Sequence, residues 1–150
     1  MVVVRYPSGT QRTFPAGTRV AEAAADPSFP RTATPLVAAL ANNELVSLAA
    51  ELAVSCTLAP VELASRTGLT IYRRSLCFLL SLAARQQFPG RRLVIGHSLG
   101  HGYLYWFEDA EEVPDADVKA LHERMRALVA ADRPVECARL AWAEAVAYFE

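Results

Sequence analysis

The sequence contains little cysteine, little lysine and no long apolar run. Its three cysteines are widely spaced, odd in number and without a C-x-x-C pair, which favours small buried residues in a reducing compartment over a disulfide framework or a zinc ribbon. The most apolar window, residues 76–84, is far shorter than the ~20 residues that span a bilayer. The apolar run at residues 1–9 is too short for a secretory signal. We therefore predict a cytoplasmic protein with no membrane partner.

The only lysine, Lys119, follows Val118. A phosphate-binding P-loop requires Gly-Lys followed by Ser or Thr, so this chain by itself is not a P-loop kinase.

Acidic residues are absent from Leu63 to Phe107, a stretch that contains six arginines. The segment from Glu108 to Glu150 contains eleven acidic residues and five basic ones. Exposed guanidinium groups attract phosphates and nucleic acids. Alternatively, the acidic segment folds back and neutralises the arginines. The sequence leaves both interpretations open.

The first part of the chain predicts a small sheet domain. Residues 2–6 and 11–17 are typical of two strands joined by a turn at Pro7 and Gly9. A short helix follows Thr18, a plausible N-cap. Residues 36–46 indicate two strands around Asn42-Asn43, and residues 52–63 indicate a last strand. This order predicts an α+β domain of the β-grasp kind.

The second part begins after a polar joint at residues 63–70. Apolar residues at helical spacing predict an amphipathic helix over 69–87, whose other face carries Arg74, Phe78, Ser81 and Arg85. Strands at 92–96 and 103–107 flank a glycine-rich turn, and helices are expected at 114–132, with Leu121, Met125 and Leu128 facing inward, and at 142–150. The fold class is therefore α+β.

Residues 96–100, "GHSLG", fit the G-x-S-x-G pattern of a hydrolase nucleophile elbow. That elbow requires a strand, a sharp turn and then a helix, whereas "HGYLYWF" follows here and favours a strand. The only histidine further downstream is His122, within a predicted surface helix. We predict that Ser98 is not a nucleophile and that the chain has no catalytic residue.

His97 and His101 lie four residues apart, a spacing seen in metal sites. They lie in a glycine-broken turn rather than on a helix, and a catalytic zinc site needs three protein ligands. We predict no metal. A contact with a small ligand stays open for both histidines.

The order of motifs resembles two known domains. "YPSGTQRTFPAGT" and "NNEL" within residues 1–62 are similar to a TGS domain, which is a β-grasp fold. Residues 68–150 resemble the second additional domain of threonyl-tRNA synthetases, on the segments "IYRRSLCFLLSLAARQQFPG", "GYLY", "ALHERMRALVAADRPV" and "WAEAVAYF". The resemblance implies an α+β domain of the tRNA-synthetase editing type that is incomplete at residue 150.

In that family the first long helix carries an H-x-x-x-H pair that serves the hydrolysis of misacylated tRNA. The matching positions here are Arg74 and Phe78. Neither side chain acts as a neutral imidazole base. The resemblance therefore implies degenerate editing positions.

Residues 71–103, "IYRRSLCFLLSLAARQQFPGRRLVIGHSLGHGY", are also similar to the N-terminal half of bacterial nucleoside (uridine) kinase-like proteins. This resemblance implies a non-catalytic regulatory module next to a P-loop kinase domain. The full-length protein would then be an ATP-dependent kinase. ATP and Mg²⁺ are expected only in that domain, and no cofactor is expected in this chain.

We predict a binding cleft between helix 69–87 and the glycine turn, with a nucleotide or tRNA as ligand. Arginine suits an anion because its planar fork grips phosphate at two points. The predicted ligand-binding residues are Arg73, Arg74, Arg85, His97, Ser98, His101 and Tyr103. In the alternative, Phe78 plugs the old active site and the arginines pair with acids of helix 115–131. Two rival functions are a tRNA-editing hydrolase that uses the 97–101 histidines and a pure RNA-binding module.

Overall fold

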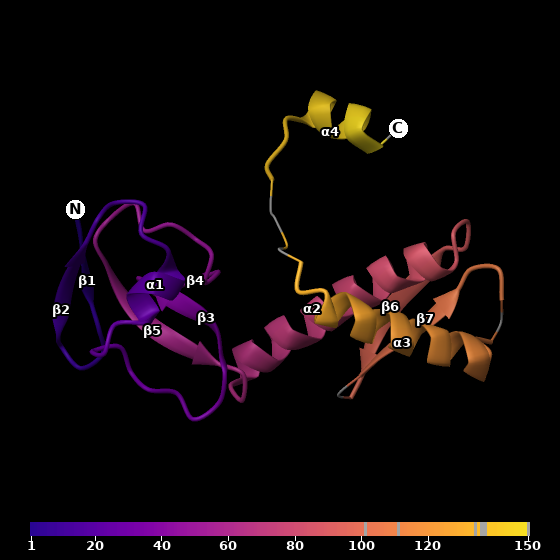
Figure 1. Cartoon of the computed structure of the whole chain (residues 1–150), viewed down its shortest axis with the longest axis horizontal. Helices are drawn as coiled ribbons and strands as arrows, with labels where there is room; N and C mark the ends of the chain where they lie inside the picture. Colours follow the sequence, from indigo (N-terminus) through magenta and orange to yellow (C-terminus); the bar gives the residue numbers. More distant parts are fainter. Residues whose placement is uncertain (101, 111, 134, 136–137, 150) are drawn as a thin grey trace. The chain divides into compact units, whose positions relative to one another are not determined.

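The computed structural model describes residues 1–100, 102–110, 112–133, 135 and 138–149. The chain divides into two compact units, Met1–Phe78 and Leu79–Glu150 (Figure 1). The division falls inside the helix α2 (Arg66–Gln87). The predicted assignment of residues 1–62 and 68–150 to two separate domains therefore stays a prediction.

The first unit is built on a five-stranded sheet with the strand order β2-β1-β5-β3-β4. The central pair, β1 and β5, is parallel, and the other pairs are antiparallel. The strands are β1 (Val2–Arg5), β2 (Gln11–Phe14), β3 (Leu36–Ala41), β4 (Glu44–Val46) and β5 (Cys56–Glu62).

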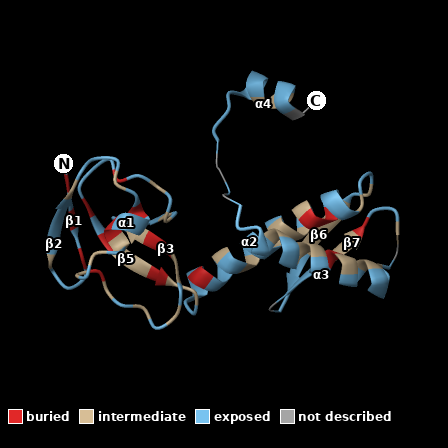
Figure 2. Cartoon of the chain, viewed as in Figure 1, coloured by how far each residue is buried: buried red, intermediate tan, exposed pale blue. Residues whose placement is uncertain are grey.

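The core of this unit lies between one face of the sheet and the short helix α1 (Val20–Ala24). Because side chains alternate along a strand, Val2 and Val4 are buried on β1 while Val3 is exposed. Val20 and Ala23 of α1 pack against this face. Figure 2 shows the buried residues gathered where α1 meets the sheet.

Two tight turns form as predicted. Gly9 has a φ of 85° in the β1–β2 turn, where the Tyr6 N–H donates to the Thr10 carbonyl at 2.9 Å. Asn42 and Asn43 have φ values of 49° and 66° between β3 and β4, and asparagine tolerates this region better than most residues. The predicted hairpins are confirmed.

The prediction of Thr18 as N-cap is wrong, since Arg19 occupies that position without a side-chain cap. The Thr18 carbonyl instead accepts a hydrogen bond from the Leu52 N–H at 2.9 Å, which holds the chain extended up to the helix. The carbonyls of Ala50 and Leu48 accept the N–H groups of Val20 and Ala21. Backbone carbonyl groups thus accept hydrogen bonds from the first N–H groups of α1, a role that a capping side chain often fills.

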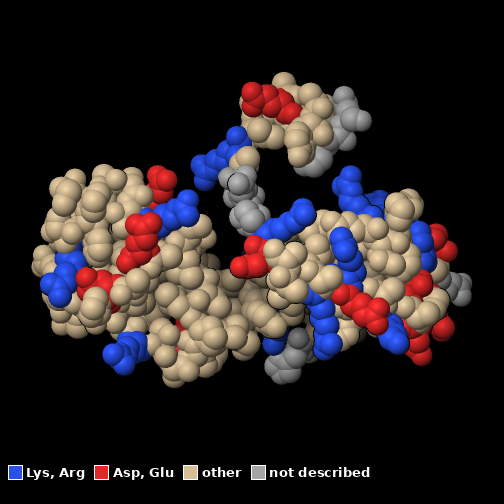
Figure 3. All heavy atoms as spheres, viewed as in Figure 1, with Lys and Arg blue, Asp and Glu red and all other residues tan. Residues whose placement is uncertain are grey.

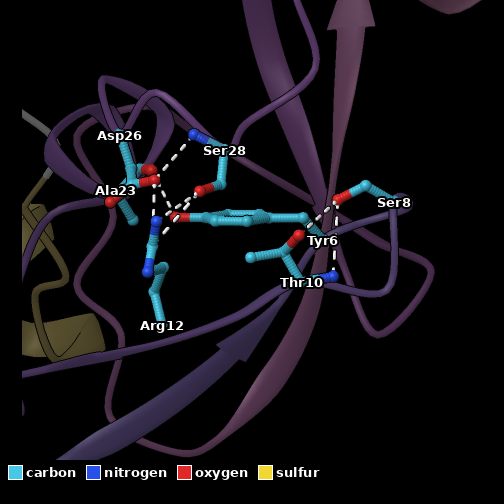
Figure 4. Close-up of polar contacts among 7 residues, drawn as sticks. All are labelled: Tyr6, Ser8, Thr10, Arg12, Ala23, Asp26 and Ser28. Atoms are coloured by element: carbon cyan, nitrogen blue, oxygen red, sulfur yellow. Dashed lines mark hydrogen bonds and ion pairs between the residues drawn. The ribbon is translucent and has the colours of Figure 1, made fainter.

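A polar network ties the first hairpin to the segment after α1 (Figure 4). The buried Tyr6 hydroxyl donates to the Ala23 carbonyl at 2.8 Å, and Arg12 Nη2 donates to Ser28 Oγ at 2.9 Å. The Ser28 N–H donates to the Asp26 carboxylate at 2.8 Å, and this bond is the main cause that lowers the pKa of Asp26. Burial raises the pKa of Tyr6 to about 12.

The helix α2 begins at Arg66, three residues before the predicted start, so the predicted polar joint is partly helical. Ser65 Oγ accepts a hydrogen bond from the Gly68 N–H at 3.0 Å, as a capping side chain does. A Cβ at residue 68 would collide with the Glu62 carbonyl. Glycine therefore allows α2 to follow closely on β5.

The second unit contains the last turns of α2, a two-stranded hairpin and two helices. The further elements are β6 (Leu93–Leu99), β7 (Gly102–Phe107), α3 (Asp115–Ala130) and α4 (Trp142–Phe149). Its core comprises Ala83, Ala84, Phe107 and Leu121. Met125 and Leu128 pack against it, so the predicted inward face of α3 is confirmed. The apolar face predicted for 69–84 is buried only in part, since Leu69, Tyr72 and Leu76 are 38–48% exposed.

A mixed α+β fold class is confirmed. The finer predictions, a TGS-type β-grasp domain and an editing-type domain, stay predictions. Of the predicted buried cysteines, Cys56 is buried and Cys77 is partly buried, while Cys137 lies outside the described residues. In the described part of the chain, no helix combines the length and apolarity needed to cross a bilayer.

Candidate functional site

The predicted ligand-binding residues are distributed over both units. Arg73 and Arg74 lie on the part of α2 that belongs to the first unit. Arg85 lies in the second unit, together with His97 and Ser98 of β6 and Tyr103 of β7. His101 lies outside the described residues. A cleft formed by all of these residues therefore stays a prediction.

Ser98 lies in a strand, directly opposite Tyr103 in the antiparallel β6–β7 pair. The turn at Gly100, where φ is 57°, leads into β7. A nucleophile elbow needs a helix at this point. Ser98 therefore lacks the strand–turn–helix setting in which a serine becomes a nucleophile.

The hairpin contains a β-bulge at the start of the "GHSLG" segment. Between the pairs Ile95–Tyr105 and Ser98–Tyr103, β6 contributes two residues, Gly96 and His97, and β7 contributes one. A bulge of this kind bends the strand and turns a side chain outward. His97 and Ser98 are exposed.

The indole of Trp106 lies against the backbone at Gly96. A Cβ at residue 96 would be 2.7 Å from the Trp106 ring. The first glycine of the G-x-S-x-G pattern thus has a packing role.

Within the described residues, no group of three histidine, cysteine or acidic side chains has an arrangement that could hold a metal.

The arginines of the acid-free stretch divide into two groups. Arg91 and Arg92, in the loop after α2, form ion pairs with acids of the downstream segment. On α2 itself, Arg66, Arg74 and Arg85 are exposed. Among the described residues of its own unit, none forms an ion pair with Arg85. Neutralisation by downstream acids, one of the two interpretations from sequence, therefore applies to the loop arginines. Figure 3 shows both signs of charge on the faces in view.

Arg91 fastens the loop to the rest of the second unit. Its Nε donates to Asp109 at 2.9 Å and its Nη1 to Asp117 at 2.9 Å. Its guanidinium carbon lies 4.0 Å from the centre of the Phe107 ring. The hydrogen bond with Asp109, followed by that with Asp117, raises the pKa of Arg91. Arg91 is therefore held by the folded unit and is not part of a simple solvated turn.

An open hollow of about 350 Å³ lies beside this loop. Its walls come from α2, through Ser81, Ala84 and Arg85, and from residues 90–93 of the loop. The lining residues thus include three arginines, Arg85, Arg91 and Arg92. From sequence, Arg85 is a predicted ligand-binding residue and the loop arginines are not, because the spacing of Arg91 and Arg92 from α2 gives no sign that the chain turns back on the helix.

Known proteins resemble this chain along its length. Threonine–tRNA ligase from Verminephrobacter eiseniae is 31% identical over 150 residues, all of this chain and 23% of the ligase. Threonine–tRNA ligase from Francisella tularensis subsp. novicida is 29% identical over 150 residues, again all of this chain and 24% of the ligase. That from Symbiobacterium thermophilum is 30% identical over 135 residues, 90% of this chain and 21% of the ligase.

The chain resembles the N-terminal region of threonine–tRNA ligases. It spans less than a quarter of the length of these relatives. No family model matches the chain. These similarities lend no support to the predicted link with a nucleoside kinase, which stays a prediction.

Proposed function

We propose that this chain is a tRNA-binding module that lacks the hydrolytic step of tRNA editing. The observation that carries the proposal is the helix α2, which presents exposed arginines and contains no acidic residue. This helix lies in a chain whose relatives are ligases that act on tRNA.

The positive charge of α2 supports the first part of the proposal, that the chain binds tRNA. Phosphate groups dominate the affinity of proteins for nucleic acids, and exposed arginines neutralise them. Arg66 and Arg74 lie on the helix surface, and nothing acidic separates them along the sequence. Arg91 is balanced by two downstream acids, whereas no ion pair within the described residues of its own unit involves Arg85 of α2.

The side chains at residues 74 and 78 support the second part of the proposal, that the chain does not hydrolyse misacylated tRNA. The sequence resemblance implies that Arg74 and Phe78 stand where the editing enzymes carry two histidines. A guanidinium stays protonated and a phenyl ring carries no lone pair, so neither can take a proton from water. Phe78 is 58% exposed. The rival hydrolase would depend on His97, which lies in the bulge of β6.

The experiment is a fluorescence-anisotropy titration of the whole chain with tRNA, uridine and nucleotides. We expect tRNA to bind, and Arg74→Gln to bind it about tenfold more weakly, because a charge-assisted contact to phosphate is lost. Arg126→Gln, which removes the same charge from the exposed face of α3, is the matched control. Negligible tRNA binding by the wild type would end the proposal. Saturable uridine binding without tRNA binding would favour the nucleoside-kinase module instead.

A second assay tests for hydrolysis. The chain is incubated with misacylated tRNA, and loss of the amino acid is followed against a protein-free blank. We expect the two rates to be equal. Deacylation that disappears in His97→Ala would instead establish the rival hydrolase.

A further inference from the structure

The hollow at the end of α2 brings Arg85, a predicted ligand-binding residue, together with a loop arginine that was not predicted to bind a ligand. Arg85 approaches it from the helix and Arg92 from the loop. The Arg92 side chain is 78% exposed. Two arginines from different elements therefore line the same depression, and a pair of guanidinium groups suits the several oxygens of one phosphate group.

Arg91 supports this arrangement without contributing a free charge. Its two carboxylate partners, Asp109 and Asp117, balance it and anchor the loop. The Arg91 guanidinium also stacks on the Phe107 ring, which restrains the loop further. The loop that carries Arg92 is thus held in place before a ligand arrives, which reduces the entropic cost of binding.

Glu108 is the group that competes with a ligand for Arg92. Its carboxylate lies 3.1 Å from Arg92 Nη1, and the two side chains are 49% and 78% exposed. Exposed pairs of this kind contribute little stability. A phosphate can therefore displace Glu108, and the carboxylate weakens anion binding while it remains.

We infer that this hollow binds a backbone phosphate of an RNA strand through Arg85 and Arg92, with Glu108 as the competing anion. The inference rests on the proposed tRNA binding and adds a contact point to it. The open shape of the hollow suits a strand that passes across the surface better than a small molecule, which is usually enclosed.

The test measures the tRNA affinity of the whole chain at several salt concentrations. We expect Arg85→Gln and Arg92→Gln each to weaken binding and to reduce the slope of log K against log salt by about one. Glu108→Gln should tighten binding severalfold, because it frees Arg92. Arg126→Gln and Glu123→Gln make the same charge changes on the exposed face of α3 and should have much smaller effects. Thermal melts of each variant check the fold.

The outcomes separate this inference from the proposed function. If the wild type binds tRNA but Arg85→Gln and Glu108→Gln behave like their α3 controls, the hollow is not a contact point and the proposed function stands. If the wild type does not bind tRNA at low salt, both fail. An NMR titration with inorganic phosphate and uridine monophosphate, followed at the amides of residues 90–93, is the third arm. Saturation by the mononucleotide with no competition from RNA would overturn the assignment to an RNA phosphate.

Discussion

At the residue scale, Gly96 lets the Trp106 indole lie against the β6 backbone. A methyl group here would lie 2.7 Å from the ring, so the indole or the strand must move. We expect Gly96→Ala to lower the free energy of unfolding of the second unit by about 1–3 kcal/mol, as overpacking does. Urea unfolding followed by Trp106 fluorescence in a Trp142→Phe background measures this loss.

Gly102 supplies the control for this substitution. An added Cβ at Gly102 would lie 3.9 Å from its nearest contact, the Leu99 carbonyl oxygen, which is an ordinary van der Waals distance. Gly102→Ala should therefore leave the unfolding free energy nearly unchanged. Equal stabilities for the two alanine variants would show that the close approach of Trp106 has no energetic consequence.

Tyr6 makes the first unit sensitive to alkaline pH. Its pKa is about 12 in the folded state and roughly 10 in an unfolded chain. A group whose pKa is raised by folding stabilises the protein fully below the unfolded value. We therefore expect stability to fall as the pH rises from about 10 to 12. Urea unfolding followed by circular dichroism over this range measures the loss.

Tyr6→Phe tests the assignment of this effect. The substitution removes the hydrogen bond to the Ala23 carbonyl and should cost about 1 kcal/mol near neutral pH. It should also flatten the alkaline decrease. Tyr72→Phe, at an exposed tyrosine of α2, should behave like the wild type. An unchanged alkaline decrease in Tyr6→Phe would contradict the account.

At the scale of elements, the loop after α2 is anchored by Arg91. The side chain pairs with Asp109 and Asp117, and stacks on Phe107. We expect Arg91→Ala to lower the melting temperature of the second unit by several degrees, and Arg91→Lys to recover only part of it, since an ammonium lacks the planar fork. Trp106 fluorescence on heating is the readout.

Arg92→Ala is the matched control for the loop. Arg92 neighbours Arg91, but its pair with Glu108 is largely exposed and contributes little stability. The melting temperature of Arg92→Ala should equal that of the wild type. If Arg91→Ala also melts like the wild type, the loop is held by other contacts and the anchoring role is wrong.

Local chemistry explains which elements the sequence predicts well. The turns at Gly9 and Asn42-Asn43 form where residues that tolerate positive φ separate two strands, because such turns depend on neighbours in sequence. The inward face of α3 follows from its periodicity for the same reason. The N-cap of α1 fails because strand-like pairing with residues 51–52, distant in sequence, holds Thr18.

The candidate site is less predictable for a related physical reason. Periodicity places Arg74 and Arg85 on α2, yet the hollow also needs the loop arginines, and their positions follow from carboxylates 18 and 26 residues downstream of Arg91. The bulge at Gly96 and His97 depends on the register with β7. Contacts between distant segments, which one sequence does not display, decide these features.

At the scale of the whole molecule, the proposal is that the chain binds tRNA through its arginines but does not hydrolyse misacylated tRNA. The chain resembles the N-terminal region of threonine–tRNA ligases, and its long helix contains arginines but no acids. Electrostatic attraction to phosphate does not require the editing histidines, whereas proton transfer does. Binding and hydrolysis are therefore separable in such a chain.

The most direct test of this account is the salt dependence of tRNA binding by the wild-type chain. If several arginines neutralise phosphates, log K falls linearly with log salt, with a slope of roughly −0.9 for each phosphate contacted in a duplex. We predict measurable binding at low salt and a slope steeper than about −2, which corresponds to more than two contacts. Absence of binding at low salt, or an affinity that does not change with salt, would contradict the central claim.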